Sequence, residues 1–540
     1  MLRWLRPRTN PRHDSWRGVV TVSVHPQVYQ DIQRASGERH VLPTSRLWQG
    51  IQVRSRFSIT RCRKSRHRIQ IGVNRLARNT QRCLLIATSN PQFDRFRLVL
   101  VAPSTRRIFA EKSQRALHLP RISIPRWTRA AEQVQAAIER KWEFKAIVLD
   151  VLADCPGGED MVIAELRNGD SMHRFPHPHS WVGLSDIRED EISGSARTIV
   201  ERLLNDGATG GGTFSRFGWI DDALDWISTE AGIDRPEFTG NVKQFNASAS
   251  FALARFDRKA APPLWFKAAG DPAIPEYRIT TALSKLFPDY LPTLVSSREN
   301  WNAWWMEDAG RSLDEARSAD MFGQAVSRLA ELQKASICHV PALVAAGCGD
   351  QRTSVLRAHI PEMMEHIDEA MARPGVIHAP RLGSTRIRKM GAIVEDACLN
   401  LEGLGIPDTL LHGDINFGNI LAGPRGCVFT DWAHAAVGHP FVMFEHLRAQ
   451  IAQETDTAPC LARLTEIYRE SWREVLTGAQ IECALAQVPP IAIVLYLFER
   501  WNWLASERRH DPQFQSYLRG LARQMDRAAQ ALELGSVLCA

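Results

Sequence analysis

The chain has 540 residues, of which 44% are hydrophobic and 24% charged, a composition typical of a globular protein rather than a fibrous one. This length favours two or three domains over one. The formal net charge of +7 is uneven, because residues 1–90 hold 18 Lys and Arg against 3 Asp and Glu, whereas the remainder holds 49 against 57. The chain after residue 90 is therefore mildly acidic, which does not favour nucleic acid as its partner.

The basic segment 1–90 has no apolar periodicity, and its arginines outnumber its lysines 17 to 1. Three interpretations are open: binding to nucleic acid or anionic lipid, an organelle transit segment, or a poorly ordered stretch without function. The absence of periodicity favours the third interpretation.

Cysteine usage and hydropathy indicate the compartment. The ten cysteines include no C-x-x-C pair, so we expect reduced thiols in a cytoplasmic protein. The longest apolar run near the end of the chain, residues 491–498, is shorter than a membrane span, so we expect no membrane association.

Residues 91–235 read as a small α+β domain. Two strand-like segments flank a turn and predict a hairpin, a periodic segment predicts a helix, and two further strands and a closing helix follow. This layout weakly resembles Nudix-type domains, but the glutamate-rich metal box of that family is absent, so we expect a recognition or packing role. The segments are 95–101 and 106–112 (hairpin), 127–142 (helix), 144–152 and 160–167 (strands), and 218–232 (helix).

The stretch "NDGATGGGTFSRFG" at 205–218 is glycine-rich but does not match a phosphate-binding loop. No Lys-Ser/Thr pair follows its last glycine, and no clear strand precedes it. We therefore expect a flexible connector. After it, residues 240–310 are strand-rich and residues 311–540 are largely helical, which predicts two lobes with a ligand cleft between them.

Polar residues cluster in "LHGDINFGNIL" at 411–421 and in "FTDW" at 429–432. An apolar run ends at His412, and a Gly-Pro-Arg-Gly turn predicts a hairpin that brings Asp431 back beside Asn419. Carboxylate and amide oxygens suit Mg²⁺, and Asp414 is then placed to accept a proton from a hydroxyl. The D-x-x-x-x-N spacing with a later metal-binding Asp is that of a kinase catalytic loop.

This "HGDINFGNIL…FTDW" pattern resembles the signature of the aminoglycoside phosphotransferase/choline kinase-like family over about residues 240–510. The resemblance implies an α+β, bilobal protein-kinase-like fold with a β-rich N-lobe (240–310) and a helical C-lobe (311–540). It also implies ATP and Mg²⁺ as cofactors and a small-molecule hydroxyl acceptor such as an aminoglycoside, an amino alcohol or a sugar. Asp414 would be the catalytic base, His412 would fix the loop, and Asn419 and Asp431 would hold the metal.

The same resemblance implies nucleotide-binding residues upstream. A strand lysine should hold the phosphates, and a helix glutamate should pair with it. A loop of small residues should cover the phosphates, and an apolar strand should bind adenine. The residues at these places are Lys267 and Glu276, Ser248 and Ser250, and Trp305, Met306 and Glu307.

The chain departs from the family pattern at four places, the first being the phosphate-covering loop at 244–254, which contains no glycine. Ala433 and His439 replace usual acidic residues, and Met443 replaces the aspartate that braces the catalytic loop, for which Glu445 lies close enough to compensate. A catalytically inactive nucleotide-binding adaptor therefore remains an alternative to a kinase, and a nucleic-acid-associated protein is a weaker one. The sequence identifies neither the acceptor, for which Glu499, Trp501, Trp503 and Glu507 are candidate contacts, nor the oligomeric state.

Overall fold

The computed structural model describes residues 93–113, 116–125, 129–152, 159–167, 179–192, 194–270, 273, 275–372, 381–454, 458–499 and 512–539, and two short strands, β1 (Ser23–Val24) and β2 (Ile51–Gln52). The basic segment 1–90 therefore lies almost entirely outside the described residues. Trp501, Trp503, Glu507 and the Glu499 side chain also lie outside them. Residues 93–124 and 128–540 form one compact unit, which is described below.

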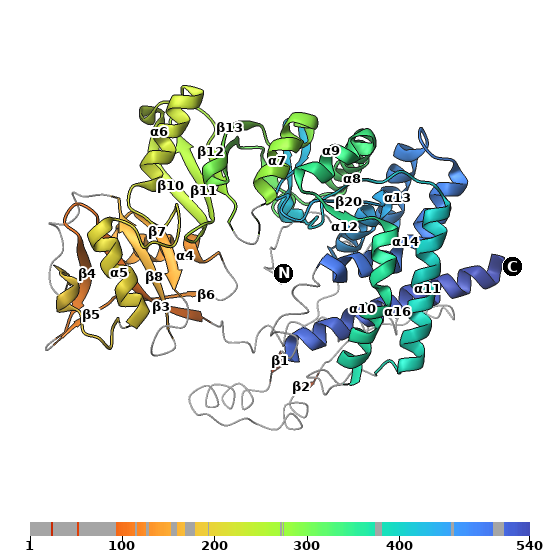
Figure 1. Cartoon of the computed structure of the whole chain (residues 1–540), viewed down its shortest axis with the longest axis horizontal. Helices are drawn as coiled ribbons and strands as arrows, with labels where there is room; N and C mark the ends of the chain where they lie inside the picture. Colours follow the sequence, from red (N-terminus) through yellow and green to blue (C-terminus); the bar gives the residue numbers. More distant parts are fainter. Residues whose placement is uncertain are drawn as a thin grey trace. The chain divides into compact units, whose positions relative to one another are not determined.

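Residues 93–231, called the accessory domain here, form a mixed sheet with three helices (Figure 1). Strand β3 pairs antiparallel with β4, as the sequence predicts, and parallel with β8, which it does not. Strands β5, β6 and β9 and helix α5 were also not predicted. The elements are β3 (Phe93–Ala102), β4 (Arg107–Lys112), β5 (Leu117–His118), β6 (Arg121–Pro125), α4 (Ala130–Trp142), β7 (Ala146–Leu152), β8 (Asp160–Leu166), β9 (His179–Val182), α5 (Gly194–Asp206) and α6 (Trp219–Ala231).

The N-lobe is a five-stranded antiparallel sheet in the order β10-β11-β12-β14-β13, with helix α7 inserted between β12 and β13. Alternation along β12 places Phe266 on one face and Lys267 on the other. The elements are β10 (Phe238–Ala247), β11 (Ala252–Arg258), β12 (Leu264–Ala268), α7 (Pro275–Leu286), β13 (Leu294–Arg298) and β14 (Ala303–Glu307).

Helix α6 of the accessory domain covers the Phe266 face of this sheet (Figure 1). The Trp226 ring lies 6.0 Å from the Phe266 ring and 6.3 Å from that of Trp305, and the Trp219 ring lies 5.7 Å from Phe266. Trp226 also donates its indole N–H to Ser296 Oγ at 2.9 Å. The accessory domain and the N-lobe therefore share one hydrophobic core across the predicted boundary near residue 235.

A buried amide joins the same two parts at a second place. The side chain of Gln244 in β10 accepts from the Val148 N–H of β7 at 2.7 Å and donates to the Val148 carbonyl at 2.9 Å. Gln135 of α4 accepts in turn from the Gln244 N–H at 2.7 Å. Gln244 is 1% exposed, so these bonds satisfy polar groups that water cannot reach.

The C-lobe is helical, which confirms the predicted α+β, two-lobed arrangement. Its long helices pack around one core, and small sheets β15-β18-β19 and β16-β20-β17 carry the polar motif. The helices are α8 (Ala319–Ser336), α9 (Val340–Ala346), α10 (Thr353–Ala372), α11 (Ser384–Gly403), α12 (Pro440–Glu454), α13 (Ala458–Trp472), α14 (Gly478–Glu499) and α16 (Pro512–Cys539), and the strands are β15 (Arg311–Ser312), β16 (Gly349–Gln351), β17 (Thr409–Leu411), β18 (Ile420–Gly423), β19 (Gly426–Phe429) and β20 (Ala436–Gly438).

Helix α14 is the one described helix that is long and apolar enough to cross a membrane by length and composition. It is longer than the predicted apolar run 491–498. Half of its apolar window is buried, and Ile481, Val488 and Leu495 belong to the C-lobe core. Its apolar side chains thus pack against α11, α12 and α16 in the structure.

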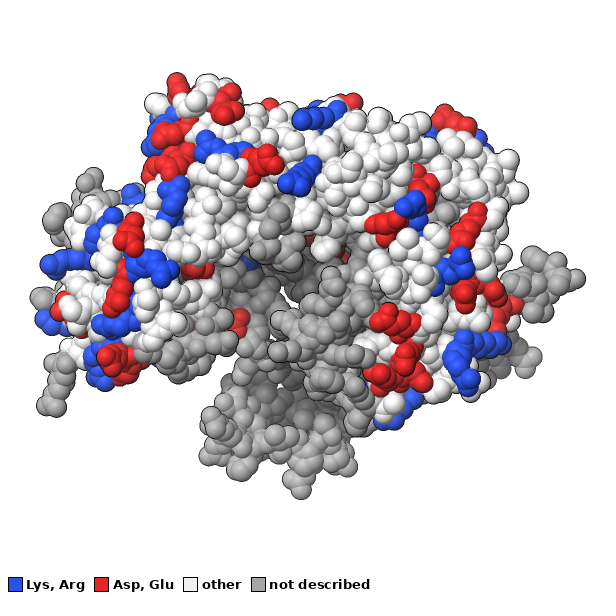
Figure 2. All heavy atoms as spheres, viewed as in Figure 1, with Lys and Arg blue, Asp and Glu red and all other residues white. Residues whose placement is uncertain are grey.

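Charged side chains are interspersed on the face drawn in Figure 2, where Lys and Arg lie close to Asp and Glu along much of the described surface. Elsewhere in the described residues such charges pair directly: Arg235 binds both Asp221 and Asp225. Among the described residues, this face carries no large area of one sign.

Replacing Trp226 by Ala should lower the free energy of unfolding by about 3–5 kcal/mol, because the variant leaves a cavity against the N-lobe sheet. Leu399→Ala is the control, since Leu399 is 45% exposed and should change stability by less than about 0.5 kcal/mol. Denaturant unfolding measures both. Equal stabilities of the two variants would contradict the shared core.

Candidate active site

The polar motif lies on the loop after β17 and on the β18–β19 hairpin. Thr430 donates its backbone N–H to the Asn419 carbonyl at 3.0 Å, which closes the base of the hairpin. Asp431 follows at once with a φ of 70°, in the left-handed region that Asp tolerates better than most residues. The hairpin therefore returns Asp431 to the neighbourhood of Asn419, as its length predicts.

Gly413 permits the turn between His412 and Asp414. Its φ is +74°, and a Cβ atom there would lie 2.0 Å from the His434 carbonyl oxygen. A side chain would thus collide with backbone that cannot rotate away. The glycine of "HGD" is a steric requirement of this loop.

Two asparagine side chains hold the Asp414 backbone. Asn416 and Asn419 donate from Nδ2 to the Asp414 carbonyl at 3.0 and 2.9 Å. With its nitrogen bound there, Asn419 can present only its oxygen to a cation. Asp414 itself is half-buried at the edge of the loop.

Lys267 of β12 connects this hairpin to helix α7. Its Nζ lies 2.5 Å from Glu276 Oε1 and 2.8 Å from Asp431 Oδ1. The Lys267 and Glu276 side chains are 6% and 1% exposed, whereas that of Asp431 is 47% exposed. The structure thus brings together the lysine, the helix glutamate and the hairpin aspartate that the sequence singles out.

The electrostatics of this trio keep the outer carboxylate ionised. Burial opposes charge on Asp431, but the charge and hydrogen bond of Lys267 outweigh it and hold the pKa of the Asp431 carboxyl below its usual value. For Lys267, burial is likewise outweighed by Glu276 and Asp431, and the pKa of its amine is raised. Asp431 is therefore an ionised and half-exposed oxygen donor.

These donors fit a hard divalent cation. Mg²⁺ is usually bound by one or two protein oxygen ligands together with phosphate and water, and Asn419 and Asp431 offer an amide and a carboxylate oxygen. Among the described residues, no group of three His, Cys, Asp or Glu forms a closed metal site. The arrangement suits a cation that arrives with a phosphate ligand.

His412 supports the loop and is uncharged near neutral pH. Burial lowers the pKa of its ring to about 4. Its Nε2 lies 2.9 Å from the Thr430 carbonyl, and its ring lies 4.5 Å from that of Trp432. A neutral ring with Nε2–H donating to the Thr430 carbonyl ties the Asp414 loop to the hairpin.

The predicted adenine-binding strand is β14, but its side chains divide between two faces. Trp305 is fully buried in the core shared with the accessory domain, so its side chain does not reach the Lys267 face. Trp304 is the cross-strand partner of Lys267, whose Nζ lies 5.7 Å from its ring centroid. Met306 packs with Trp304, and Glu307 is exposed at the strand end. Trp304, not Trp305, thus shares the Lys267 face, where it is 2% exposed and packs against Tyr277.

Ser248 and Ser250 lie in the turn between β10 and β11. Ser248 Oγ accepts from the Phe251 N–H at 3.1 Å, so it closes the turn. Ser250 Oγ would lie 2.2 Å from a Cβ on Gly270, two residues after β12. The turn therefore reaches the end of the strand that carries Lys267.

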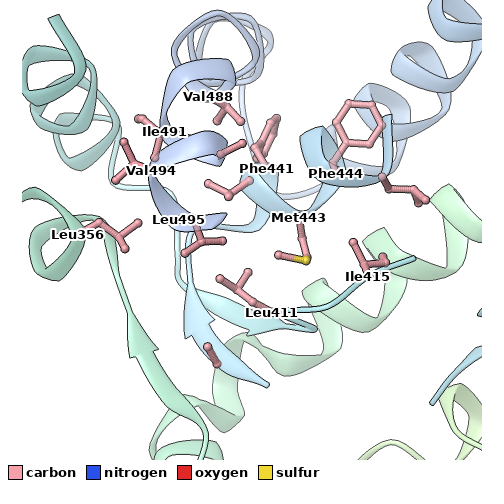
Figure 3. Close-up of a cluster of buried hydrophobic side chains, with 14 of the residues drawn as sticks. Leu356, Leu411, Ile415, Phe441, Met443, Phe444, Val488, Ile491, Val494 and Leu495 are labelled. Atoms are coloured by element: carbon pink, nitrogen blue, oxygen red, sulfur yellow. The ribbon is translucent and has the colours of Figure 1, made fainter. Parts of the chain in front are cut away.

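The loop that carries Asp414 is braced by apolar packing and one amide. Met443 of α12 is fully buried beside Ile415 and Leu411 (Figure 3). Gln450, about two helix turns further along α12, donates from Nε2 to the Ile415 carbonyl. Glu445, which the sequence offered as a substitute brace, accepts from Arg448 with both oxygens at 2.7 Å. The support that the missing aspartate would give this loop thus comes from the packing of Met443 and the hydrogen bond of Gln450, not from Glu445.

Sequence reasoning missed Trp304, Asn416 and Gln450. The period-2 alternation of β14 could have separated Trp304 from Trp305 once one face was known to be buried. The "N-x-G" spacing at 416–418 is an Asx-turn signal, since Asn416 Oδ1 accepts from the Gly418 N–H at 2.9 Å. Gln450 carries no local signal.

Comparison with known proteins gives structural matches only. No family model and no curated protein matches the chain. It is similar to a macrolide 2′-phosphotransferase from Brachybacterium faecium (15% identity, 55% of this chain and 97% of that one, TM-score 0.38). It is also similar to a choline kinase from Streptococcus pneumoniae (13%, 58% and 98%, TM-score 0.36) and a Plasmodium vivax ethanolamine kinase (12%, 61% and 93%, TM-score 0.39). These are small-molecule phosphotransferases and kinases, the group that the 411–432 motif resembles.

Gly413→Ala should lower the free energy of unfolding by about 2 kcal/mol or more, because the methyl group meets the His434 carbonyl and the left-handed φ is strained. Gly403→Ala, at the end of α11 with no atom within 4 Å of the new Cβ, is the matched control and should be neutral or stabilising. Thermal or urea unfolding measures both variants. A Gly413→Ala protein as stable as the control would show that the loop can move.

Proposed function

We propose that the protein is an ATP-dependent phosphotransferase that moves the γ-phosphoryl group to a hydroxyl of a small molecule. The observation that carries this proposal is the simultaneous contact of Lys267 with Glu276 and Asp431. Kinase catalysis requires the strand lysine, the helix glutamate and the metal-binding aspartate to be in place together. Here Asp431 follows the β18–β19 hairpin, whose base bonds Thr430 to Asn419, and Asn419 in turn bonds the Asp414 backbone.

Each residue then has a role that its surroundings support. Asp414 orients the acceptor hydroxyl and accepts its proton, while Lys267 holds the α- and β-phosphates and Glu276 orients Lys267. Asn419 and Asp431 would hold Mg²⁺, which when bound supplies charge neutralisation on the phosphates. Most of the rate comes from positioning and electrostatic stabilisation, so the rigidity of the Asp414 loop matters.

The acceptor belongs to the class of small hydroxylated molecules, such as aminoglycosides, amino alcohols or sugars. The cysteines whose side chains the structure describes are free, which supports a reducing, cytoplasmic location. ATP is abundant in that compartment.

A nucleotide-binding protein without catalysis is the second candidate, and the Met443 replacement favours it. The apolar packing of Met443 and the Gln450 bond to Ile415 weaken that argument, because the loop remains braced without the aspartate. Asp414 also keeps its two asparagine contacts.

Asp414→Asn should lower the turnover of ATP about 10²–10⁴-fold, measured with a hydroxyl acceptor that the wild type phosphorylates. The reason is that the amide cannot take the hydroxyl proton. MgATP affinity should stay within about twofold, because Asp414 does not hold the nucleotide. Asp396→Asn, an exposed position on α11, is the matched control and should leave turnover unchanged. The assay follows ADP release across a panel of amino-sugars, amino alcohols and sugars. Turnover by Asp414→Asn equal to that of the control would show that Asp414 is not the catalytic base. Wild-type protein that binds MgATP but turns over no acceptor would favour the adaptor.

A further inference from the structure

The glycine-rich segment 207–218 is an ordered loop that packs on the N-lobe, whereas the sequence predicts a flexible connector. Its backbone is closed by bonds from the Thr209 N–H to the Ser215 carbonyl at 2.9 Å and from the Phe217 N–H to the Gly207 carbonyl at 2.8 Å. Thr209 is 2% exposed, and Phe214 belongs to the shared core. The segment is therefore a fixed part of the accessory domain.

This loop contacts the tip of the β10–β11 hairpin, the turn that holds Ser248 and Ser250. Phe214 donates its backbone N–H to the Ala249 carbonyl at 3.1 Å. A Cβ on Gly212 would lie 2.3 Å from the Ala249 oxygen, and one on Gly211 would lie 3.0 Å from Ala249 Cβ. The two backbones thus approach as closely as glycine alone allows.

The opposite side of the tip is equally confined. A Cβ on Gly270 would lie 2.2 Å from Ser250 Oγ and 2.7 Å from the Ser250 carbonyl oxygen. Strand β10 is further fixed by Gln244, which bonds the backbone of β7. The hairpin is therefore held at its tip from two sides and along its first strand.

We propose that the accessory domain acts as a built-in clamp, through Gly212 and Phe214, that fixes the β10–β11 hairpin over the nucleotide phosphates. This inference rests on the proposed phosphotransferase function. Gly212 is a positioning residue in this account, because it acts through Ala249 and does not touch the nucleotide.

The clamp explains how a hairpin tip without glycine can cover the phosphates of a bound nucleotide. In kinases a glycine-rich loop covers the phosphates and closes over the bound nucleotide. The turn here is "NASASF" at 246–251, which contains no glycine, and Gly212 and Gly270 on its neighbours instead let those segments pack closely against it. A tip ordered before binding loses less conformational entropy when the nucleotide binds, so displacing it should weaken affinity.

The test is calorimetric titration of MgATP into the full chain carrying Gly212→Ala. The new methyl group should displace the Ala249 carbonyl and weaken MgATP binding about fivefold to tenfold. Turnover at saturating MgATP should remain within about twofold, because the Asp414 loop is untouched. Gly183→Ala is the matched control in the same domain: its Cβ meets no atom closer than 3.4 Å, and its MgATP affinity should equal that of the wild type.

A graded second variant keeps the test independent of folding. Gly211→Ala makes a milder contact at 3.0 Å and should weaken MgATP binding less than Gly212→Ala. Melting curves of each variant identify any loss of fold. Folded Gly212→Ala and Gly211→Ala proteins with wild-type affinity would overturn the clamp alone. A folded wild type that does not bind MgATP would instead overturn the proposed function, and the clamp with it.

Discussion

The buried amine of Lys267 is the constraint on which the site depends. A charge that is almost fully shielded from water must be neutralised by partners, and removing one partner of such a pair costs about 3–5 kcal/mol. Glu276 comes from helix α7, and Asp431 from the exit of the β18–β19 hairpin. The amine therefore fixes strand, helix and hairpin relative to one another, and it leaves an ionised, half-exposed carboxylate beside Asn419.

The loop of Asp414 is held by steric fit, apolar packing and amide bonds rather than by a bracing carboxylate. Gly413 lies against the His434 carbonyl, Met443 packs beside Ile415, and Gln450 binds the backbone at Ile415. An apolar brace avoids burying a further charge, which would need its own partner. The loss of an expected aspartate thus does not by itself mean that the loop is loose.

Local patterns predicted how the chain folds around the candidate site where local geometry decides the outcome. The 411–431 motif folds as expected because a short hairpin returns Asp431 to Asn419, and Lys267 was evident as a lysine in an apolar strand. The face of β14 was not predictable, because α6, some eighty residues upstream of that strand, determines that Trp305 is buried and Trp304 faces Lys267. The glycine-rich segment 205–218 was wrongly predicted to be a flexible connector for the same reason: its partner, Ala249, lies far from it in the sequence.

Calorimetric titration of MgATP into the wild-type chain and into Asp431→Ala tests the central claim most directly. The account predicts that the wild type binds MgATP and that Asp431→Ala, while still folded, loses most of this binding, because it removes both a cation ligand and a partner of Lys267. Equal MgATP binding by the two proteins would place the nucleotide elsewhere. No binding by a folded wild type would contradict the phosphotransferase assignment.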